Sequence, residues 1–402
     1  MRAVLVTLTF SAVAFADAPK WEDIVPPADL TGWRVISGEW RVENGELIGT
    51  AKSGQAAIVL SRDLADFEVE CEMAVPEPCP AGIVVRAHDL PALPLAEGVD
   101  VATAPKQVYG YSLGFDASNI PGSAGHGVLS FPPENVRTAT TSVPPLRREW
   151  IPLAMSAHGE NVDGSINKSA TWRLSNDRFV KGALAFTAGV PGWSTPTTVR
   201  FRNIRVKDFK REGNWRPLWN GIDFSQFEFF GEEEWRVLDG GIVGTSGKKK
   251  SEGYAKTRAL FKDFRVRGTY RMFGEGNYGL FYHSTIAYDD KHYPIISGVQ
   301  GEVAWGWPSA TGCLYESYKR GWIEKPDMKR VGAFAQDMKG LNEIEILVQG
   351  NRRATWVNGV KVTDITDETP AYTEGAFALQ LHTGGVSGIM WKDLYIVDLD
   401  KK

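Results

Sequence analysis

The chain has 402 residues, enough for two to three domains of ordinary size or for two large β-sandwiches. Hydrophobic residues make up 43% of it and charged residues 23%, a composition that excludes intrinsic disorder. The formal net charge is −4 and no long basic run occurs, so we expect no nucleic-acid partner. The 42 glycines, 22 prolines and 14 tryptophans favour many turns between aromatic-rich strands and argue against an all-helical protein.

The first residues have the pattern of a secretory signal peptide. Arg2 supplies a positive charge, residues 4–15 form an apolar run, and Ala14-Phe15-Ala16 resembles a cleavage site. The run is shorter than the roughly 20 apolar residues of a membrane span, and we find no other candidate span. We therefore expect residues 1–16 to be removed, and the mature protein to be secreted or periplasmic.

The chain contains three cysteines, Cys71, Cys79 and Cys313. Export would permit a disulfide between Cys71 and Cys79, which would leave Cys313 unpaired. Geometry decides whether such a bridge forms, so the sequence leaves both states open.

The chain is an internal duplication. Residues 39–50 (EWRVENGELIGT) and 234–245 (EWRVLDGGIVGT) are identical at seven of twelve positions, and further matches follow in the same order. The spacing of about 190 residues is far longer than a solenoid repeat, so whole domains are repeated. This predicts an N-terminal domain over 17–212, after the signal at 1–16, and a C-terminal domain over 213–402.

Each half reads as a series of short strands separated by turn residues. We expect strands at 67–73, 185–187, 199–206, 264–272, 344–348, 377–381 and 394–397. No long segment has a helical period, so each half is predicted to be an antiparallel two-sheet sandwich. Asn358-Gly359, between two alternating runs, predicts a two-residue hairpin of type I′ character.

The second half holds the residues best suited to chemistry. Gln300 and Glu302 are two apart on a predicted strand, so their side chains leave the same face, and Gln380 and His382 do the same. If these faces line one cavity, a carboxylate, an imidazole and two amides converge there with Tyr315. The alternative is that Gln380 and His382 form only the polar outer face of an alternating strand.

Two further groups suggest ligands. Trp305 and Trp307 share a face, where their rings could stack on sugars or instead pack as core aromatics. Asp289, Asp290 and His292 could supply ligands to a divalent cation, although such a run is more often a solvated loop. No cofactor and no metal ligand is assigned with certainty; a divalent cation remains an open alternative.

Several motifs of the second half resemble the 3-keto-disaccharide hydrolase domain family, and they occur in the family's order. They are LWNG at 218–221, WRVLDG at 235–240, NYGLF at 277–281, TGCLY at 311–315, WVNG at 356–359 and LQLH at 379–382. The resemblance implies that the fold is all-β, with two tandem concanavalin A-like jelly-roll sandwiches.

The chain departs from the family pattern in two places. Where the family commonly has Ser-Gly-Tyr-Glu-x-Gln, this chain reads SGVQGE at 297–302, which exchanges the carboxylate and the amide, and His283 stands where the family commonly has Arg. In the first half, Thr187 and Gly189 occupy the positions of Gln380 and His382. We therefore expect the N-terminal copy to lack the chemistry.

The resemblance implies an enzyme that cleaves 3-keto-glycosides, by hydrolysis or by elimination followed by hydration, in the C-terminal domain. The predicted catalytic residues are Glu302, His382, Gln380 and Tyr315, and the predicted substrate-binding residues are Gln300, His283, Asn277, Trp305 and Trp307. The predicted partner is a saccharide, a keto-sugar glycoside. The alternative is an exported lectin-like protein that binds carbohydrate without breaking a bond.

Overall fold

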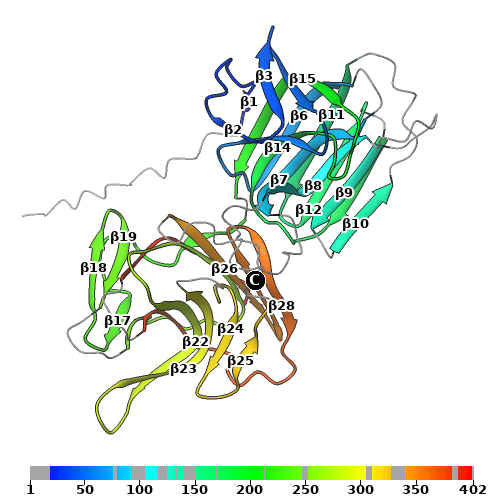
Figure 1. The fold of residues 1–402 in the computed structure, drawn as a ribbon. Coiled ribbons are helices and arrows are strands. Elements are labelled where there is room, and N and C mark those ends of the chain that lie inside the picture. The colour runs from blue at the N-terminus through cyan, green and yellow to red at the C-terminus, as the bar shows by residue number, and fades with distance from the viewer. Residues whose placement is uncertain are drawn as a thin grey trace, which may run out of the picture.

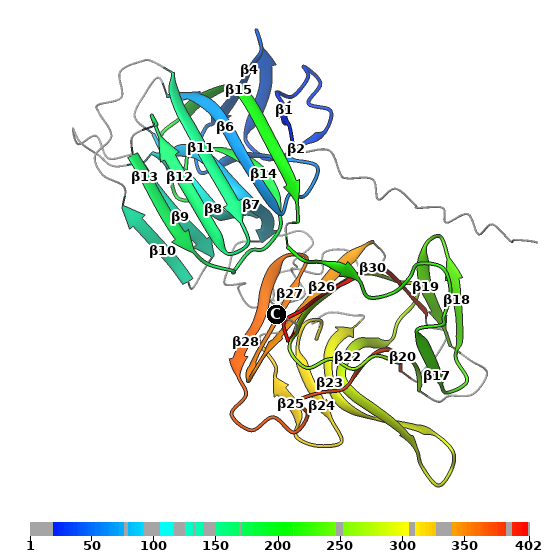
Figure 2. The ribbon, with the colours of Figure 1, turned by 180° about the vertical axis from the view of Figure 1, so that it is seen from behind.

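The computed structural model contains two β-sandwiches, one from each half of the chain (Figures 1 and 2). It describes residues 19–75, 79–91, 105–115, 125–131, 134–139, 150–168, 170–211, 213–246, 252–304, 310–326, 340–382 and 388–400. In these ranges every regular element is a strand and every strand pair is antiparallel, which confirms the predicted fold class. The predicted signal peptide lies outside the described residues.

The first half contains two sheets. Its back sheet has the order β13 (Ala170–Ser175), β12 (Asn161–Ile166), β11 (Ile151–His158), β6 (Asp66–Ala74), β15 (Thr197–Lys210), β4 (Glu46–Ala51) and β3 (Glu39–Glu43), and β1 (Trp21–Asp23) also pairs with β15. Its front sheet has the order β10 (Glu134–Ala139), β9 (Gly125–Phe131), β8 (Lys106–Phe115), β7 (Ala81–Pro91), β14 (Ala183–Ala188), β5 (Ala56–Leu60) and β2 (Trp33–Ser37).

The second half repeats this arrangement. Its back sheet has the order β28 (Val360–Thr366), β27 (Arg352–Val357), β26 (Asn342–Gln349), β21 (Phe264–Met272), β30 (Gly388–Asp398), β19 (Gly241–Thr245) and β18 (Glu234–Leu238), and β16 (Arg216–Pro217) pairs with β30. Its front sheet has the order β25 (Gly321–Glu324), β24 (Leu314–Ser317), β23 (Pro294–Ala304), β22 (Asn277–Tyr288), β29 (Ala376–Leu381), β20 (Gly253–Thr257) and β17 (Phe227–Phe230). Strand for strand, the order is that of the first half, so the duplication extends to the topology.

Alternating side chains build the core of each sandwich. On β21, for example, Phe264, Val266, Tyr270 and Met272 are buried in the cluster that fills the second sandwich. All seven predicted strands lie within observed ones. The predicted hairpin at Asn358-Gly359 joins β27 to β28, and both residues have the positive φ that a type I′ turn requires.

The cysteines contribute to packing. Cys71 and Cys79 are both buried in the core of the first sandwich, and no disulfide joins any of Cys71, Cys79 and Cys313 in the described residues. Of the two states that the sequence leaves open for Cys71 and Cys79, the structure therefore has the reduced one.

The two sandwiches are joined by backbone pairing as well as by side chains. Residues 177–181, which follow β13, run along β28: Val180 N donates to Gly359 O at 2.8 Å and Lys361 N donates to Arg178 O at 2.8 Å. Val357 and Val360 of the second half are buried in the core cluster of the first. The hairpin at the tip of β27–β28 therefore completes the first sandwich.

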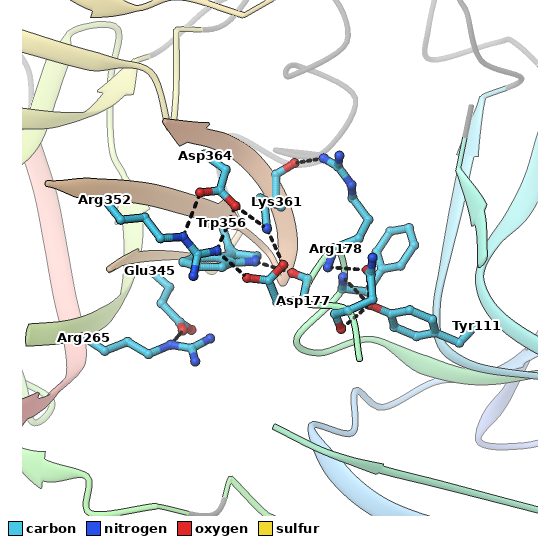
Figure 3. A network of polar contacts seen from close by, with 11 residues as sticks. Tyr111, Asp177, Arg178, Arg265, Glu345, Arg352, Trp356, Lys361 and Asp364 are labelled. Atoms are coloured by element: carbon cyan, nitrogen blue, oxygen red, sulfur yellow. Dashed lines mark hydrogen bonds and ion pairs between the residues drawn. The ribbon is translucent and has the colours of Figure 1, made fainter. Parts of the chain in front are cut away.

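Charged groups surround this joint (Figure 3). Asp177 accepts hydrogen bonds from Lys361 and, at 3.0 Å, from Arg352. Its backbone carbonyl accepts from Trp356 Nε1 at 2.7 Å. Lys361 and Arg352 also bind Asp364, so two cations and two carboxylates form a closed network at the joint.

Candidate functional site

The register of the front sheet places predicted site residues in one row. Tyr254 on β20 lies opposite Gln380 on β29, Gln380 lies opposite Gly279 on β22, and Gly279 lies opposite Glu302 on β23. Opposed residues of antiparallel strands share a face. The intervening residues, such as Leu381, point into the core. Gln380 and Glu302 therefore share the outer face of this sheet.

The neighbouring row adds the other amide and the tyrosine. Gln300 lies opposite Tyr315 on β24, and its position two residues from Glu302 puts it on the same face. His382 follows the last residue of β29, and its backbone N–H still donates to Asn277 O at 3.1 Å. Six of the nine predicted residues thus lie together: Asn277, Gln300, Glu302, Tyr315, Gln380 and His382.

Hydrogen bonds connect the amides to the carboxylate. Gln300 Nε2 donates to Gln380 Oε1 at 2.7 Å and lies 3.4 Å from Asn277 Oδ1. Asn277 Nδ2 in turn donates to Glu302 Oε2 at 2.9 Å. Gln300, Glu302 and Gln380 are each at most 4% exposed although they face away from the core. Gln380 is therefore not part of a solvated outer face, which was the simpler alternative, whereas the His382 side chain is 42% exposed.

The same chain of bonds continues to the histidine through two residues that the sequence analysis missed, Glu252 and Tyr254. Gln380 forms a hydrogen bond with the Tyr254 hydroxyl, which donates to Glu252 Oε2. Glu252 Oε1 lies 3.1 Å from His382 Nε2. We call these seven connected residues the polar network: Glu302, Asn277, Gln300, Gln380, Tyr254, Glu252 and His382.

The two carboxyl groups of the polar network differ in acidity. Burial raises the pKa of Glu302 to about 7, against the opposing effects of the Asn277 hydrogen bond and of His382. Burial also acts to raise the pKa of Glu252, but hydrogen bonds from His382 and Tyr254 outweigh it and keep the pKa below its ordinary value. At neutral pH Glu252 is therefore ionised, whereas Glu302 exchanges a proton. Such a pair can supply an acid and a fixed negative charge.

A glycine makes room for the central hydrogen bond. Gly279 lies between Gln380 and Glu302 in the row, and a Cβ on it would be 2.3 Å from Gln300 Nε2. Any side chain at this position would occupy the space that the Gln300 amide uses to reach Gln380. The glycine of the NYGLF motif therefore has a steric role in the polar network.

His283 lies elsewhere. Its two ring nitrogens contact the backbone carbonyls of Tyr372, at 3.0 Å, and Lys262, at 2.7 Å, and the side chain is buried against Phe264 and Tyr282. Burial lowers its pKa, against the two hydrogen bonds, which favours the neutral ring. The structure therefore does not bring His283 into the polar network, contrary to its predicted place beside the substrate.

The remaining sequence predictions concern tryptophans and a cation. Trp305 and Trp307 lie outside the described residues. Asp289 Oδ1 accepts from the backbone N–H groups of Lys291 and Tyr293, and His292 stacks on Tyr288 with ring centroids 4.5 Å apart. In the part of the chain that the structure describes, no three His, Cys, Asp or Glu residues are grouped as a metal site would require.

The first half has the same row of positions without the polar groups. The positions of Tyr254, Gln380, Gly279 and Glu302 in the second half are occupied in the first half by Ala57, Thr187, Gly82 and Gly114, respectively. Thr187 Oγ1 donates to Gly82 O at 3.4 Å, and no carboxylate stands in the row. At these four described positions the first sandwich therefore lacks the tyrosine, amide and carboxyl that the second sandwich has.

The protein thus consists of two β-sandwiches, and the second carries the polar network on its front sheet. A family model described as the 3-keto-alpha-glucoside-1,2-lyase-like domain matches residues 20–207 and again residues 214–397. The chain belongs to this family, with one copy in each half. It is thus a carbohydrate-active protein, of a glycosidase-like or carbohydrate-binding kind. A search of curated proteins found no match.

Several solved structures are similar to a single half. A candidate glycosyl hydrolase from Parabacteroides distasonis ATCC 8503 is 23% identical, with 46% of this chain and 94% of that one covered and a TM-score of 0.35. The carbohydrate-binding module CBM66 from Bacillus subtilis is 15% identical, with coverages of 44% and 96% and a TM-score of 0.34. The catalytic domain of an endo-1,3-β-glucanase from Thermotoga petrophila RKU-1 is 12% identical, with coverages of 48% and 100% and a TM-score of 0.32.

Across the described ranges, the structure contains no helix with the length and apolar character of a membrane span.

Proposed function

We propose that the second sandwich cleaves 3-keto-glycosides at the polar network. The observation that carries this proposal is the pairing of two different proton-transfer groups. Glu302, with a pKa of about 7, and the His382–Glu252 pair stand at opposite ends of one hydrogen-bonded chain. Family membership supports the choice of a 3-keto sugar as substrate.

His382 is the base in this proposal. The carbonyl at C3 of the sugar acidifies the proton on C2, so one well-placed base can remove it. Glu252 holds the proton on His382 Nε2 and leaves the lone pair at Nδ1, the arrangement of a general base oriented by a carboxylate. Glu252 is thus a positioning residue, held in place by Tyr254.

Glu302 is the acid. Removal of the C2 proton gives an enolate across C2 and C3. When the enolate electrons form a C1–C2 double bond and restore the C3 carbonyl, the bond from C1 to the glycosidic oxygen breaks, and that oxygen takes the proton of Glu302. Burial keeps a large fraction of Glu302 protonated near pH 7, which a carboxyl of ordinary pKa would not be. The Tyr315 hydroxyl and the amide of Gln380 or Gln300 stabilise the enolate oxygen at C3. Addition of water across the double bond then completes a net hydrolysis.

Export forms part of the proposal. The apolar run of residues 4–15 and the Ala14-Phe15-Ala16 site support secretion or a periplasmic location. The mass of the protein recovered after export should correspond to a chain that begins at Asp17.

The His382→Ala variant tests the reaction. Release of aglycone from a 3-keto-glucoside should be lost, while thermal unfolding changes little, because the His382 side chain is 42% exposed. His158→Ala, a partly exposed histidine of the first half, is the matched control and should keep full activity. Activity retained by His382→Ala would refute the assignment of the base. Tight glycan binding by the wild type without turnover, with and without chelator, would instead favour the lectin-like alternative.

A further inference from the structure

The edge of the front sheet next to Gln300 carries an aromatic pair. Tyr315 on β24 lies opposite both Gln300 on β23 and Trp322 on β25, so the three side chains share the outer face. The Tyr315 and Trp322 rings meet edge to face, with centroids 5.2 Å apart and an angle of 77°. Trp322 is 40% exposed, so much of this large apolar side chain remains in contact with water.

The turn between β24 and β25 presents a third aromatic residue, Tyr318. Its side chain is 67% exposed, and its φ of 57° lies in the left-handed region, which a bulky residue with a Cβ adopts only at a cost in free energy. Glycine or asparagine would satisfy this backbone at lower cost. A strained backbone that holds an exposed tyrosine is the kind of feature that occurs at functional sites.

A buried ionic clamp makes this turn rigid. Arg320 donates to Glu316 at 2.6 and 2.9 Å and to Asp367 at 2.8 Å through two nitrogens, and both carboxylates are almost fully buried. Tyr372 adds a hydrogen bond from its hydroxyl to Ser317 O at 3.2 Å. The turn is therefore fixed on both sides of Tyr318, and a ring held in this way loses little entropy when it binds a ligand.

The hairpin that carries Tyr318 adjoins the polar network. β24 pairs with β23, the strand on which Gln300 and Glu302 lie, and Tyr315 stands opposite Gln300. Burial, followed by the negative charges of Glu252 and Asp289, raises the pKa of the Tyr318 hydroxyl.

We propose that Tyr318 and Trp322 form a subsite for a second pyranose ring, the leaving group of a 3-keto-disaccharide. This inference rests on the proposed function, because it assumes that the 3-keto ring occupies the polar network. Pyranose rings present apolar C–H faces that stack on aromatic rings, and rigid aromatic side chains at a polar site are suited to that contact. Lys325, whose Nζ lies 4.7 Å from the Trp322 ring centroid, adds a hydrogen-bond donor for sugar hydroxyls.

Two substrates distinguish this subsite from the reacting centre. Trp322→Ala and Tyr318→Ala should each lower kcat/KM for a 3-keto-disaccharide about tenfold, because a stacking contact is lost. The same variants should change kcat/KM for methyl 3-keto-glucoside less than twofold, since methanol as leaving group does not reach the subsite. Tyr318→Phe, which keeps the ring, should behave as the wild type with both substrates.

Trp21→Ala is the matched control, because Trp21 is a similarly exposed tryptophan (37%) on the back sheet of the first half, packed against Arg205. An equal loss on both substrates, or no loss on the disaccharide, would overturn the subsite. A loss confined to aryl 3-keto-glucosides would overturn the assignment to a sugar. If the wild type cleaves neither substrate, the proposed function fails. Calorimetry then still tests the subsite, because Trp322→Ala must weaken binding of the disaccharide about tenfold and leave the affinity for methyl 3-keto-glucoside unchanged.

Discussion

Gly279→Ala perturbs the polar network at its centre without touching a titratable group. The new Cβ would lie 2.3 Å from Gln300 Nε2, 2.6 Å from its Cγ and 2.8 Å from its Cδ. Ordinary contacts between such atoms begin at about 3.4 Å, so the Gln300 side chain must move away by roughly 1 Å. Its 2.7 Å hydrogen bond to Gln380 cannot survive that movement.

The expected net cost is a destabilisation of about 1 kcal/mol. A buried amide that loses its partner costs about 1–3 kcal/mol, while alanine in a strand gains about 0.5–1 kcal/mol over glycine. The φ of Gly279 is one that alanine tolerates, so backbone strain adds nothing. Turnover of a 3-keto-glucoside should fall about a hundredfold, because displacing a group by about 1 Å at a reacting centre has effects of that size.

A double-mutant cycle in urea tests the reasoning. In a Gln300→Ala background the three clashing atoms are gone, so Gly279→Ala should be neutral or stabilise the protein by about 0.5 kcal/mol. The coupling free energy between the two sites should therefore be about 1–1.5 kcal/mol. If the two substitutions are additive, the space at Gly279 does not serve Gln300, and the steric role argued for this glycine is wrong.

Three other predictions concern the acidity of Glu302, the joint between the halves and the backbone strain at Tyr318. Above pH 7, Glu302→Gln should be more stable than the wild type by about 1–3 kcal/mol, and the difference should vanish as the pH falls to about 4.5. The reason is that folded wild type holds the Glu302 proton up to a pKa of about 7, so its stability declines between about pH 4.5 and 7. Urea titrations at several pH values measure this difference. Asp177→Ala should cost about 1–2 kcal/mol, since Lys361 and Arg352 lose a shared partly buried carboxylate, whereas Asp163→Ala, at an exposed pair, should cost less than about 0.5 kcal/mol. Tyr318→Gly should stabilise the protein by up to about 1 kcal/mol in thermal unfolding while it weakens cleavage of a 3-keto-disaccharide; a destabilised variant would show that the φ of 57° carries no strain.

The sequence predicted what depends on local periodicity and turn chemistry. The strand at 264–272 was predicted to the residue, because its apolar and polar side chains alternate with period two. Asn358-Gly359 fixed the register of β27 and β28 through its positive φ values. Asn44-Gly45 and Asp239-Gly240 form hairpins with the same backbone signs, which the duplicated EWRV segments already contain.

Pairing between distant strands was the part that the sequence did not contain. Glu252 and Tyr254 join the polar network only because β20 aligns Tyr254 with Gln380, some 125 residues later in the chain. Their spacing of two is a weak signal that many surface strands share. His283 was misplaced for a related reason: the irregular register after Tyr282 and the left-handed φ of His283 turn its side chain away from the face that simple alternation would give it.

The joint between the halves explains how a sandwich without the polar network contributes to the structure. Val357 and Val360 flank the Asn358-Gly359 turn and are fully buried in the core of the first sandwich, so each half is incomplete at this point without the other. A Cβ on Gly359 would lie 2.6 Å from Lys181 O, so the glycine that the turn needs for its backbone is also needed for docking. Because the same strands β27 and β28 continue into the back sheet that supports the front sheet, loss of the first half would expose apolar surface on the sandwich that carries Glu302 and His382. The first half therefore stabilises the second through this contact.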